Sequence, residues 1–129
     1  MTRVLQITDL HVFATPDQRL KGIPTRESLQ QVVDYILQNE KPFEHVIITG
    51  DHTHDEQLAS YEAVAQIISP WNDRLWQIPG NHDERSILRN VFKGRVSGDG
   101  EQPVQFQFSV GDWLMIGLDT HLPGEVSGQ

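Results

Sequence analysis

Cysteine is absent from this sequence of 129 residues. Its absence excludes a disulfide framework, thiolate nucleophiles and thiolate metal sites. Basic side chains are also scarce, because 10 Lys and Arg stand against 18 Asp and Glu, which gives a formal net charge of -8. Nucleic acids and anionic membranes are usually bound by basic patches, so we expect neither as a partner. An anionic substrate would need positive charge from another source, and metal ions could supply it.

Long hydrophobic runs are missing too, and the apolar runs present are far too short to span a bilayer. From Met1 the chain leads directly into a strand-like run at Val4, without the charged start and apolar core of a signal peptide. We therefore expect a cytoplasmic location. The length and the hydrophobic fraction of 37% predict one folded domain covering residues 1–129.

Apolar periodicity predicts strands that alternate with helices. Strand-like runs lie at residues 4–8, 46–48 and 75–78, and helical patterns lie at residues 25–39, 56–68 and about 87–91. Thr25 is expected to cap the first helix. The apolar face of that helix is expected to comprise Leu29, Val32, Val33, Ile36 and Leu37.

The pattern changes after residue 103, where apolar and polar residues alternate up to Val110. This alternation predicts a strand with one wet face. Gly111 and Asp112 form a two-residue turn signal, and residues 113–118 return as a more continuously apolar strand. The whole chain is therefore expected to be an α/β fold with parallel pairing, followed by an antiparallel hairpin.

Polar clusters follow the first three predicted strands. They are Asp9-Leu10-His11, Gly50-Asp51-His52-Thr53-His54-Asp55 and Gly80-Asn81-His82-Asp83. Because ligands of open α/β sheets bind beyond the carboxyl ends of the strands, we expect these clusters to converge in space.

The residue types in these clusters favour a metal site. Carboxylates, imidazoles and an amide oxygen suit Mn, Fe, Zn or Mg. Asp9 and His11 would share one face if the strand continued through them. Glycine before Asp51 and before Asn81 would allow sharp turns and close backbone approach. Each cluster alone is a common turn, and Asp83 could instead cap the third helix, but their occurrence in order favours a joint site.

With these motifs, the chain resembles the calcineurin-like metallophosphoesterases. The signature of that family is D-x-H, then G-D, then G-N-H-D or G-N-H-E, followed by two later histidine motifs. The segments at residues 6–13 and 118–128 resemble its class III cyclic-nucleotide phosphodiesterase branch. The resemblance extends over roughly residues 4–128.

The resemblance implies two divalent metal ions, with iron or manganese first and zinc or magnesium as alternatives. Asp9 and His11 would bind the first ion, and Asp51 would bridge both. Asn81 would bind the second ion and also contact the substrate phosphate.

Catalytic roles would fall to two further residues of the third motif. His82 would bind the scissile phosphate or assist the leaving oxygen, and Asp83 would orient His82. The implied reaction is hydrolysis of a phosphodiester by a water that the two ions activate. The substrate expected first is 3′,5′-cyclic AMP, which would give AMP.

The family fold is a two-sheet sandwich flanked by helices. Since the two later histidine motifs are not found, the chain is expected to be a partial sandwich that lacks the C-terminal half of that fold. Weak or absent turnover would follow from the incomplete metal sites. Two alternatives stay open: a general metallophosphoesterase acting on another phosphoester, and a non-catalytic truncated domain.

Other histidines are weaker candidates. His52 and His54 flank the second motif and are possible extra ligands, or else residues of a wet loop. His45 is expected on the surface, and His121 is expected near the same sheet edge but outside a G-H-x-H motif. Arg85 is expected on the exposed face of its helix.

Self-association is expected as well. Without a second half to cover it, a sheet face bearing Phe106 or Phe108 would lie open, and the hairpin would present a free edge. Open apolar faces and free edges favour pairing with another copy, and a homodimer is the commonest outcome.

Overall fold

The centre of the fold is a parallel sheet of three strands, in the order β1-β4-β5. The computed structural model describes residues 1–128, and within them β1 spans Val4–Ile7, β4 spans His45–Thr49 and β5 spans Leu75–Ile78. Ile7 lies opposite Ile48, and Thr49 lies opposite Ile78, so the three strands end close to one line. The predicted α/β order with parallel pairing is confirmed.

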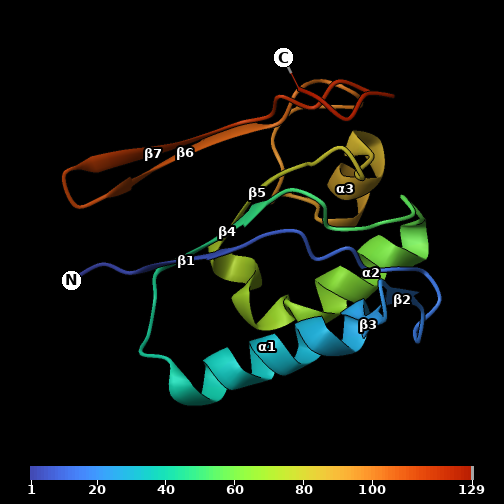
Figure 1. Cartoon of the computed structure of the whole chain (residues 1–129). Coiled ribbons are helices and arrows are strands. Elements are labelled where there is room, and N and C mark those ends of the chain that lie inside the picture. Colours follow the sequence, from blue (N-terminus) through green and yellow to red (C-terminus); the bar gives the residue numbers. More distant parts are fainter. Residues whose placement is uncertain (129) are drawn as a thin grey trace.

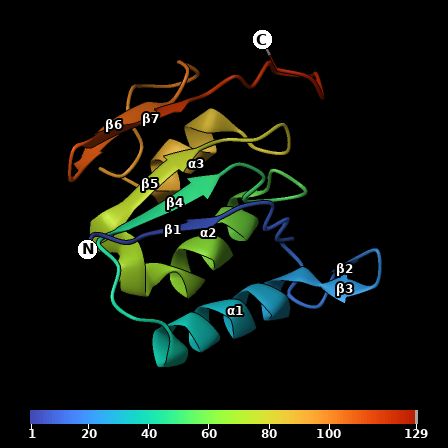
Figure 2. The ribbon, with the colours of Figure 1, turned by 60° about the vertical axis from the view of Figure 1, so that its left-hand side comes forward.

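Two helices cover one face of this sheet, as Figures 1 and 2 show. They are α1 (Thr25–Asn39) and α2 (Leu58–Ile67). A 3-10 helix, η1 (Ser69–Arg74), leads into β5, and α3 (Arg85–Val91) follows β5. The core between helices and sheet is apolar and includes Val33, Ile36, Val46, Ile48, Tyr61 and Val64.

Both long helices differ in detail from the sequence-based predictions. Thr25 is the first helical residue and not the N-cap, and its hydroxyl donates instead to the carbonyl of His11, at 2.9 Å. Val32 and Leu37 were predicted to lie on the buried face, but they are about half exposed because α1 lies beside the edge strand β1. The second helix starts at Leu58 because Glu56, with a φ of 56°, cannot be helical.

Two short strands occupy a segment that showed no strand pattern. They are β2 (Arg19–Leu20) and β3 (Ile23–Pro24), which pair antiparallel. Lys21 and Gly22 between them both have positive φ, which is the backbone of a type I′ turn. Lysine gives little sign of such a turn, so sequence reasoning missed this hairpin.

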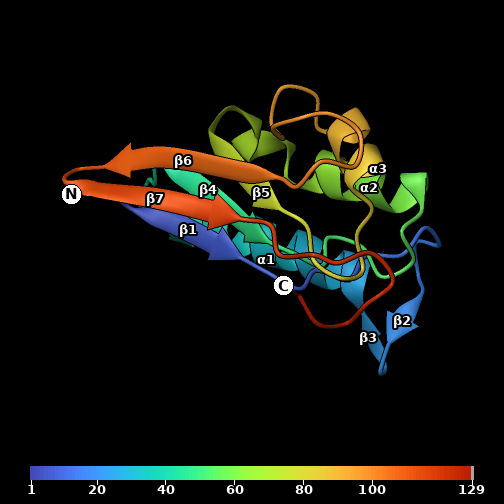
Figure 3. The same ribbon diagram turned by 90° about the horizontal axis from the view of Figure 1, so that it is seen from above.

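A second hairpin covers the other face of the sheet (Figure 3). Strands β6 (Gln105–Val110) and β7 (Trp113–Leu118) pair around the Gly111-Asp112 turn, as predicted. Phe108 is buried and stacks on Trp76 of β5, with ring centroids 4.7 Å apart.

The inner face of this hairpin corrects two predictions. Phe106 and Phe108 do not lie open, because both rings pack on Trp76. His45 is not a free surface residue, since it stacks on Phe108 at 4.2 Å and accepts a hydrogen bond from the Trp76 indole. The exposed apolar side chains lie on the outer face and at the turn of the hairpin: Trp113, Leu114, Ile116 and Leu118.

Gly117 makes this packing possible, because a Cβ built there would lie 2.7 Å from Cδ1 of Phe106 and closer still to other ring atoms. The Gly117→Ala variant is therefore expected to lose about 1–3 kcal/mol of unfolding free energy by overpacking. Urea unfolding would measure the loss, with Ser109→Ala on the exposed face as the control. Equal midpoints for Gly117→Ala and the wild type would contradict the expectation.

A search of the helices in residues 1–128 finds none with the length and apolar character needed to cross a membrane.

Candidate metal centre

Three loops meet at the carboxyl edge of the parallel sheet. Backbone hydrogen bonds join the loop after β1 to the loop after β4, among them those from Asp9 N–H to the Gly50 carbonyl and from His11 N–H to the Asp51 carbonyl. The loop after β5 joins them through the N–H of His82, which donates to Oδ1 of Asp51 at 3.0 Å. The structure thus brings together three segments that lie far apart in the sequence.

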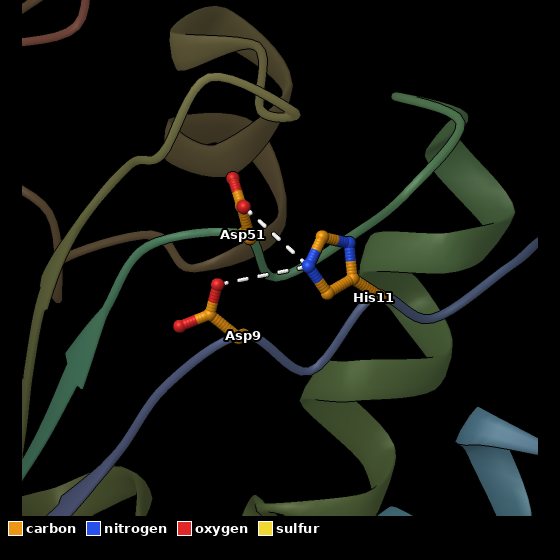
Figure 4. A group of neighbouring side chains, drawn as sticks. All are labelled: Asp9, His11 and Asp51. Carbon is orange, nitrogen blue, oxygen red and sulfur yellow. Dashed lines mark ion pairs between the residues drawn. The ribbon is translucent and has the colours of Figure 1, made fainter. Parts of the chain in front are cut away.

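Asp9, His11 and Asp51 form the tightest group at this edge (Figure 4). Their ligand atoms all lie within 4.8 Å of one another. The Nε2 atom of His11 points between the two carboxylates, 3.6 Å from Oδ1 of Asp9 and 3.5 Å from Oδ2 of Asp51. Two carboxylate oxygens and one imidazole nitrogen are a donor set that fits a divalent ion of the Mn, Fe or Zn type.

The backbone at these three residues is unusual. Asp9, His11 and Asp51 have φ values of 56°, 46° and 50°, in the left-handed region that residues with a side chain rarely adopt. β1 has already ended at Ile7, so an extended strand does not continue through Asp9 and His11 and does not place them on one face. Two left-handed residues bring these side chains together instead. Such backbone strain is concentrated at functional sites.

Two glycines allow the loops to approach each other. Gly50 has a φ of 96°, and a Cβ there would lie 3.0 Å from Cα of Gly80. A Cβ on Gly80 would in turn lie 2.8 Å from Cγ of Asp51 and closer to Oδ1. The backbone of the third motif therefore lies directly against the Asp51 carboxylate.

A methyl group at position 80 should consequently displace this carboxylate. We expect Gly80→Ala to weaken binding of Mn²⁺ by at least about tenfold, the scale seen when groups that orient a metal ligand are lost. Calorimetric titration would measure the affinity. Gly94→Ala is the control for backbone strain away from the site, since Gly94 has a φ of 77° and a Cβ there meets no atom within 4 Å. An unchanged affinity in Gly80→Ala would show that Asp51 can move without loss.

Three imidazoles cluster beside the carboxylates. The rings of His54 and His82 are stacked with centroids 4.6 Å apart, and each lies within 5.4 Å of the His11 ring. Nδ1 of His82 lies 3.2 Å from the carbonyl oxygen of His54. Burial lowers the pKa of His54, and the neighbouring His82 and His11 rings lower it further, so the neutral form is favoured.

Asp83 lies behind the cluster and not in it. Its buried carboxylate accepts hydrogen bonds from the backbone N–H groups of Gly80, His52 and Thr53 and from the Tyr61 hydroxyl. Burial alone would raise the pKa of Asp83, but the charge of His52 and these hydrogen bonds lower it to about 2. The Asp83 carboxylate is therefore an anchor for two loops.

Asp83 also does not cap α3, because Glu84 occupies the N-cap position and accepts from the N–H groups of Ser86 and Ile87. His52 is fully buried, with Nδ1 bonded to Asp83 and Nε2 to Gln77. Neither ring nitrogen faces the Asp9, His11 and Asp51 group, so we do not retain His52 as a ligand candidate.

Asn81 and His121 line a small hollow of about 90 Å³ at the same edge of the sheet. A larger cavity of about 430 Å³ adjoins Asp9 and His11 on the other side and is otherwise mostly apolar. The two candidate ligands of the first motif are therefore reachable from open space.

Arg85 is buried, contrary to the prediction that it lies on an exposed helix face. Its guanidinium forms a two-pronged ion pair with Asp119, with N–O distances of 2.7 and 3.1 Å. Asp119 also accepts from the N–H groups of Val104 and His121. This pair connects α3 to the end of β7, and no pattern in the sequence indicated it.

Comparison with known proteins agrees with this geometry. Residues 2–122 match the calcineurin-like phosphoesterase family. The chain belongs to that family, as its motifs indicated.

Among curated relatives, the chain is 34% identical over 125 residues to the 3′,5′-cyclic adenosine monophosphate phosphodiesterase CpdA of Pseudomonas aeruginosa. It is 32% identical over 127 residues to the protein of that name from Vibrio vulnificus (strain CMCP6), and 31% identical over 127 residues to that from Escherichia coli (strain K12). These alignments cover 97–98% of the chain but 44–45% of the relatives. The chain thus spans slightly less than half the length of these relatives.

Proposed function

We propose that the protein containing this chain is a metal-dependent phosphodiesterase that hydrolyses 3′,5′-cyclic AMP to AMP. The observation that carries the proposal is the group of Asp9, His11 and Asp51, whose ligand atoms lie within 4.8 Å at the carboxyl edge of the sheet. Membership of the calcineurin-like phosphoesterase family and the names of the relatives support it.

Divalent ions are the proposed cofactors, with iron or manganese preferred and zinc or magnesium as alternatives. Asp9, His11 and Asp51 would hold the first ion, while Asp51 and the amide oxygen of Asn81 would contribute to the second. When bound, such ions supply the phosphate with positive charge, which is scarce in this acidic chain, and lower the pKa of bound water.

Residues of the third motif are proposed to bind the substrate phosphate and to assist the leaving oxygen. The backbone N–H of His82 donates to Asp51, and the His82 ring lies beside the His11 ring. In this position His82 would bind a phosphate oxygen or protonate the leaving oxygen. Asn81 would contact the same phosphate. Asp83 contributes by holding the backbone of Gly80 and His52 in place, since it bonds both N–H groups.

Hydrolysis assays on the metal-stripped full-length protein that contains this chain would test the proposal, because the chain alone is expected to show weak or no turnover. We expect no turnover of cyclic AMP after chelation, and recovery on addition of Mn²⁺ or Fe²⁺. Comparison with bis-p-nitrophenyl phosphate and with phosphomonoesters separates a cyclic-nucleotide enzyme from a general phosphoesterase. Metal binding without turnover of any ester would instead identify a non-catalytic domain and overturn the proposal.

We also propose that this chain self-associates, and that the protein is cytoplasmic. The exposed side chains of Leu114, Ile116 and Leu118 on β7 support association, because they form an apolar face on a short hairpin. Light scattering across a micromolar concentration range would test it. A constant mass of 14.7 kDa for this chain would exclude a dimer, and Ile116→Glu should shift any dimer towards monomer.

A further inference from the structure

His54 contacts both histidines of the candidate metal centre, although it lies outside the three motifs. Its Nδ1 lies 3.2 Å from Nδ1 of His11, and its ring stacks on His82 with an interplanar angle of 17°. No other imidazole in residues 1–128 lies within hydrogen-bond distance of a His11 ring nitrogen. His54 is therefore placed to influence the orientation of the His11 ring.

The position of His54 is fixed by its own backbone and neighbours. Its N–H donates to the carbonyl of Val12 at 3.0 Å, and its ring packs on Phe13 with centroids 4.9 Å apart. Asp55, the next residue, accepts from the N–H of Ala14 at 2.8 Å. The loop after β4 is thus bound to the residues that follow His11, so the His11–His54 contact does not depend on a free side chain.

Two imidazole nitrogens this close can share only one proton in a hydrogen bond. The Nε2 atom of His11 faces two carboxylate oxygens at 3.5 and 3.6 Å, and a metal ion bound between them requires the lone pair on Nε2. The proton of neutral His11 must then reside on Nδ1, where His54 can accept it.

We propose that His54 is a positioning residue that accepts the Nδ1–H of His11 and thereby directs the Nε2 lone pair of His11 towards Asp9 and Asp51. This inference deepens the proposed function and rests on it for the identity of the ligand, a divalent cation. His54 replaces the carboxylate or carbonyl that usually orients a ligating histidine. It touches neither the ion nor the substrate in this role.

Nitrogen-15 NMR of the metal-free protein tests the tautomer directly, at a pH where both rings are neutral. His11 is expected to be the Nδ1–H tautomer in the wild type, and His54→Phe should shift it towards Nε2–H. Phenylalanine keeps the stacking on His82 but removes the acceptor. A wild-type His11 protonated on Nε2, or a spectrum unchanged by His54→Phe, would overturn the proposal.

Calorimetry with Zn²⁺ or Mn²⁺ supplies the second readout. We expect His54→Phe to weaken the first-site affinity about 10- to 100-fold, the usual cost of losing such a partner. His54→Gln is the matched variant, because its amide oxygen can accept from Nδ1 and should restore most of the affinity. Equal losses in both variants would mean that His54 ligates the ion itself, which contradicts the positioning role. If the expected tautomer is found in a protein that binds no metal, the proposed function fails while the His11–His54 contact stands.

Discussion

Asp51→Asn is expected to lower metal-dependent hydrolysis of cyclic AMP by at least about 10³-fold, equivalent to about 4 kcal/mol of transition-state stabilisation. Oδ1 of Asp51 accepts the N–H of His82, whereas Oδ2 faces Nε2 of His11. In the variant the amide oxygen should keep the bond to His82. The NH₂ group, which is no metal ligand, would then occupy the ion-facing position.

Steady-state kinetics of the full-length protein that contains this chain, with saturating Mn²⁺, would measure the effect. Asp34→Asn is a suitable control, because Asp34 lies on an exposed turn of α1 and its carboxylate accepts a hydrogen bond from the exposed Gln30 side chain. Both variants should unfold at urea concentrations close to that of the wild type, which shows that the loss is chemical. Activity of Asp51→Asn within tenfold of the wild type would mean that this carboxylate holds no essential ion.

Asp83→Asn should give the largest loss of stability, about 3–5 kcal/mol, the range for removing one partner of a buried ion pair. Oδ2 of Asp83 accepts from the N–H groups of Gly80 and His52, and Oδ1 accepts from the N–H of Thr53 and the Tyr61 hydroxyl. Whichever way the asparagine amide turns, its NH₂ group must face donors. Equilibrium unfolding in urea would measure the change, with exposed Asp73→Asn as the control.

The same carboxylate predicts a pH dependence. The pKa of Asp83 is about 2 in the folded protein and near 3.8 in an unperturbed carboxyl group. Because the folded value is the lower one, ionised Asp83 adds about 2 kcal/mol of stability above the unfolded pKa, and this is lost as the pH falls through 2. When the free energy of unfolding is plotted against pH, the curve between neutral pH and pH 2 should therefore fall more steeply for the wild type than for Asp83→Asn. Parallel curves would contradict the buried charge.

Sequence patterns predicted the regular elements well, because their signals are local. The turn at Gly111-Asp112 and the alternating strand before it were found from residue order alone. Burial was harder to predict, since it depends on what packs above each face. Phe106 and Phe108 follow the predicted alternation, but only the fold shows that Trp76 covers them.

The site shows the same division. Motif spacing and strand order were enough to place Asp9, Asp51 and His82 at one edge. The partners of Asp83 could not be predicted. Tyr61 lies on the apolar face of a helix, and this pattern predicted burial but not the hydrogen bond from its hydroxyl to Asp83. The contact of His54 with His11 likewise depends on backbone pairing between two loops, and the local sequence of neither loop indicates this pairing.

Asp9, His11 and Asp51 have left-handed backbone, so each of these residues lowers the stability of the fold while it supplies a side chain to the candidate metal site. A left-handed residue with a side chain costs roughly 1–2 kcal/mol relative to glycine, and only Asn and Asp relieve part of it. Selection for stability alone would therefore favour glycine at all three positions, most of all at His11, where imidazole offers no local relief. Because these side chains are kept, the free energy of unfolding of the metal-free protein is lower than it would be with glycine. Binding of a cation would offset this loss by stabilising the folded state.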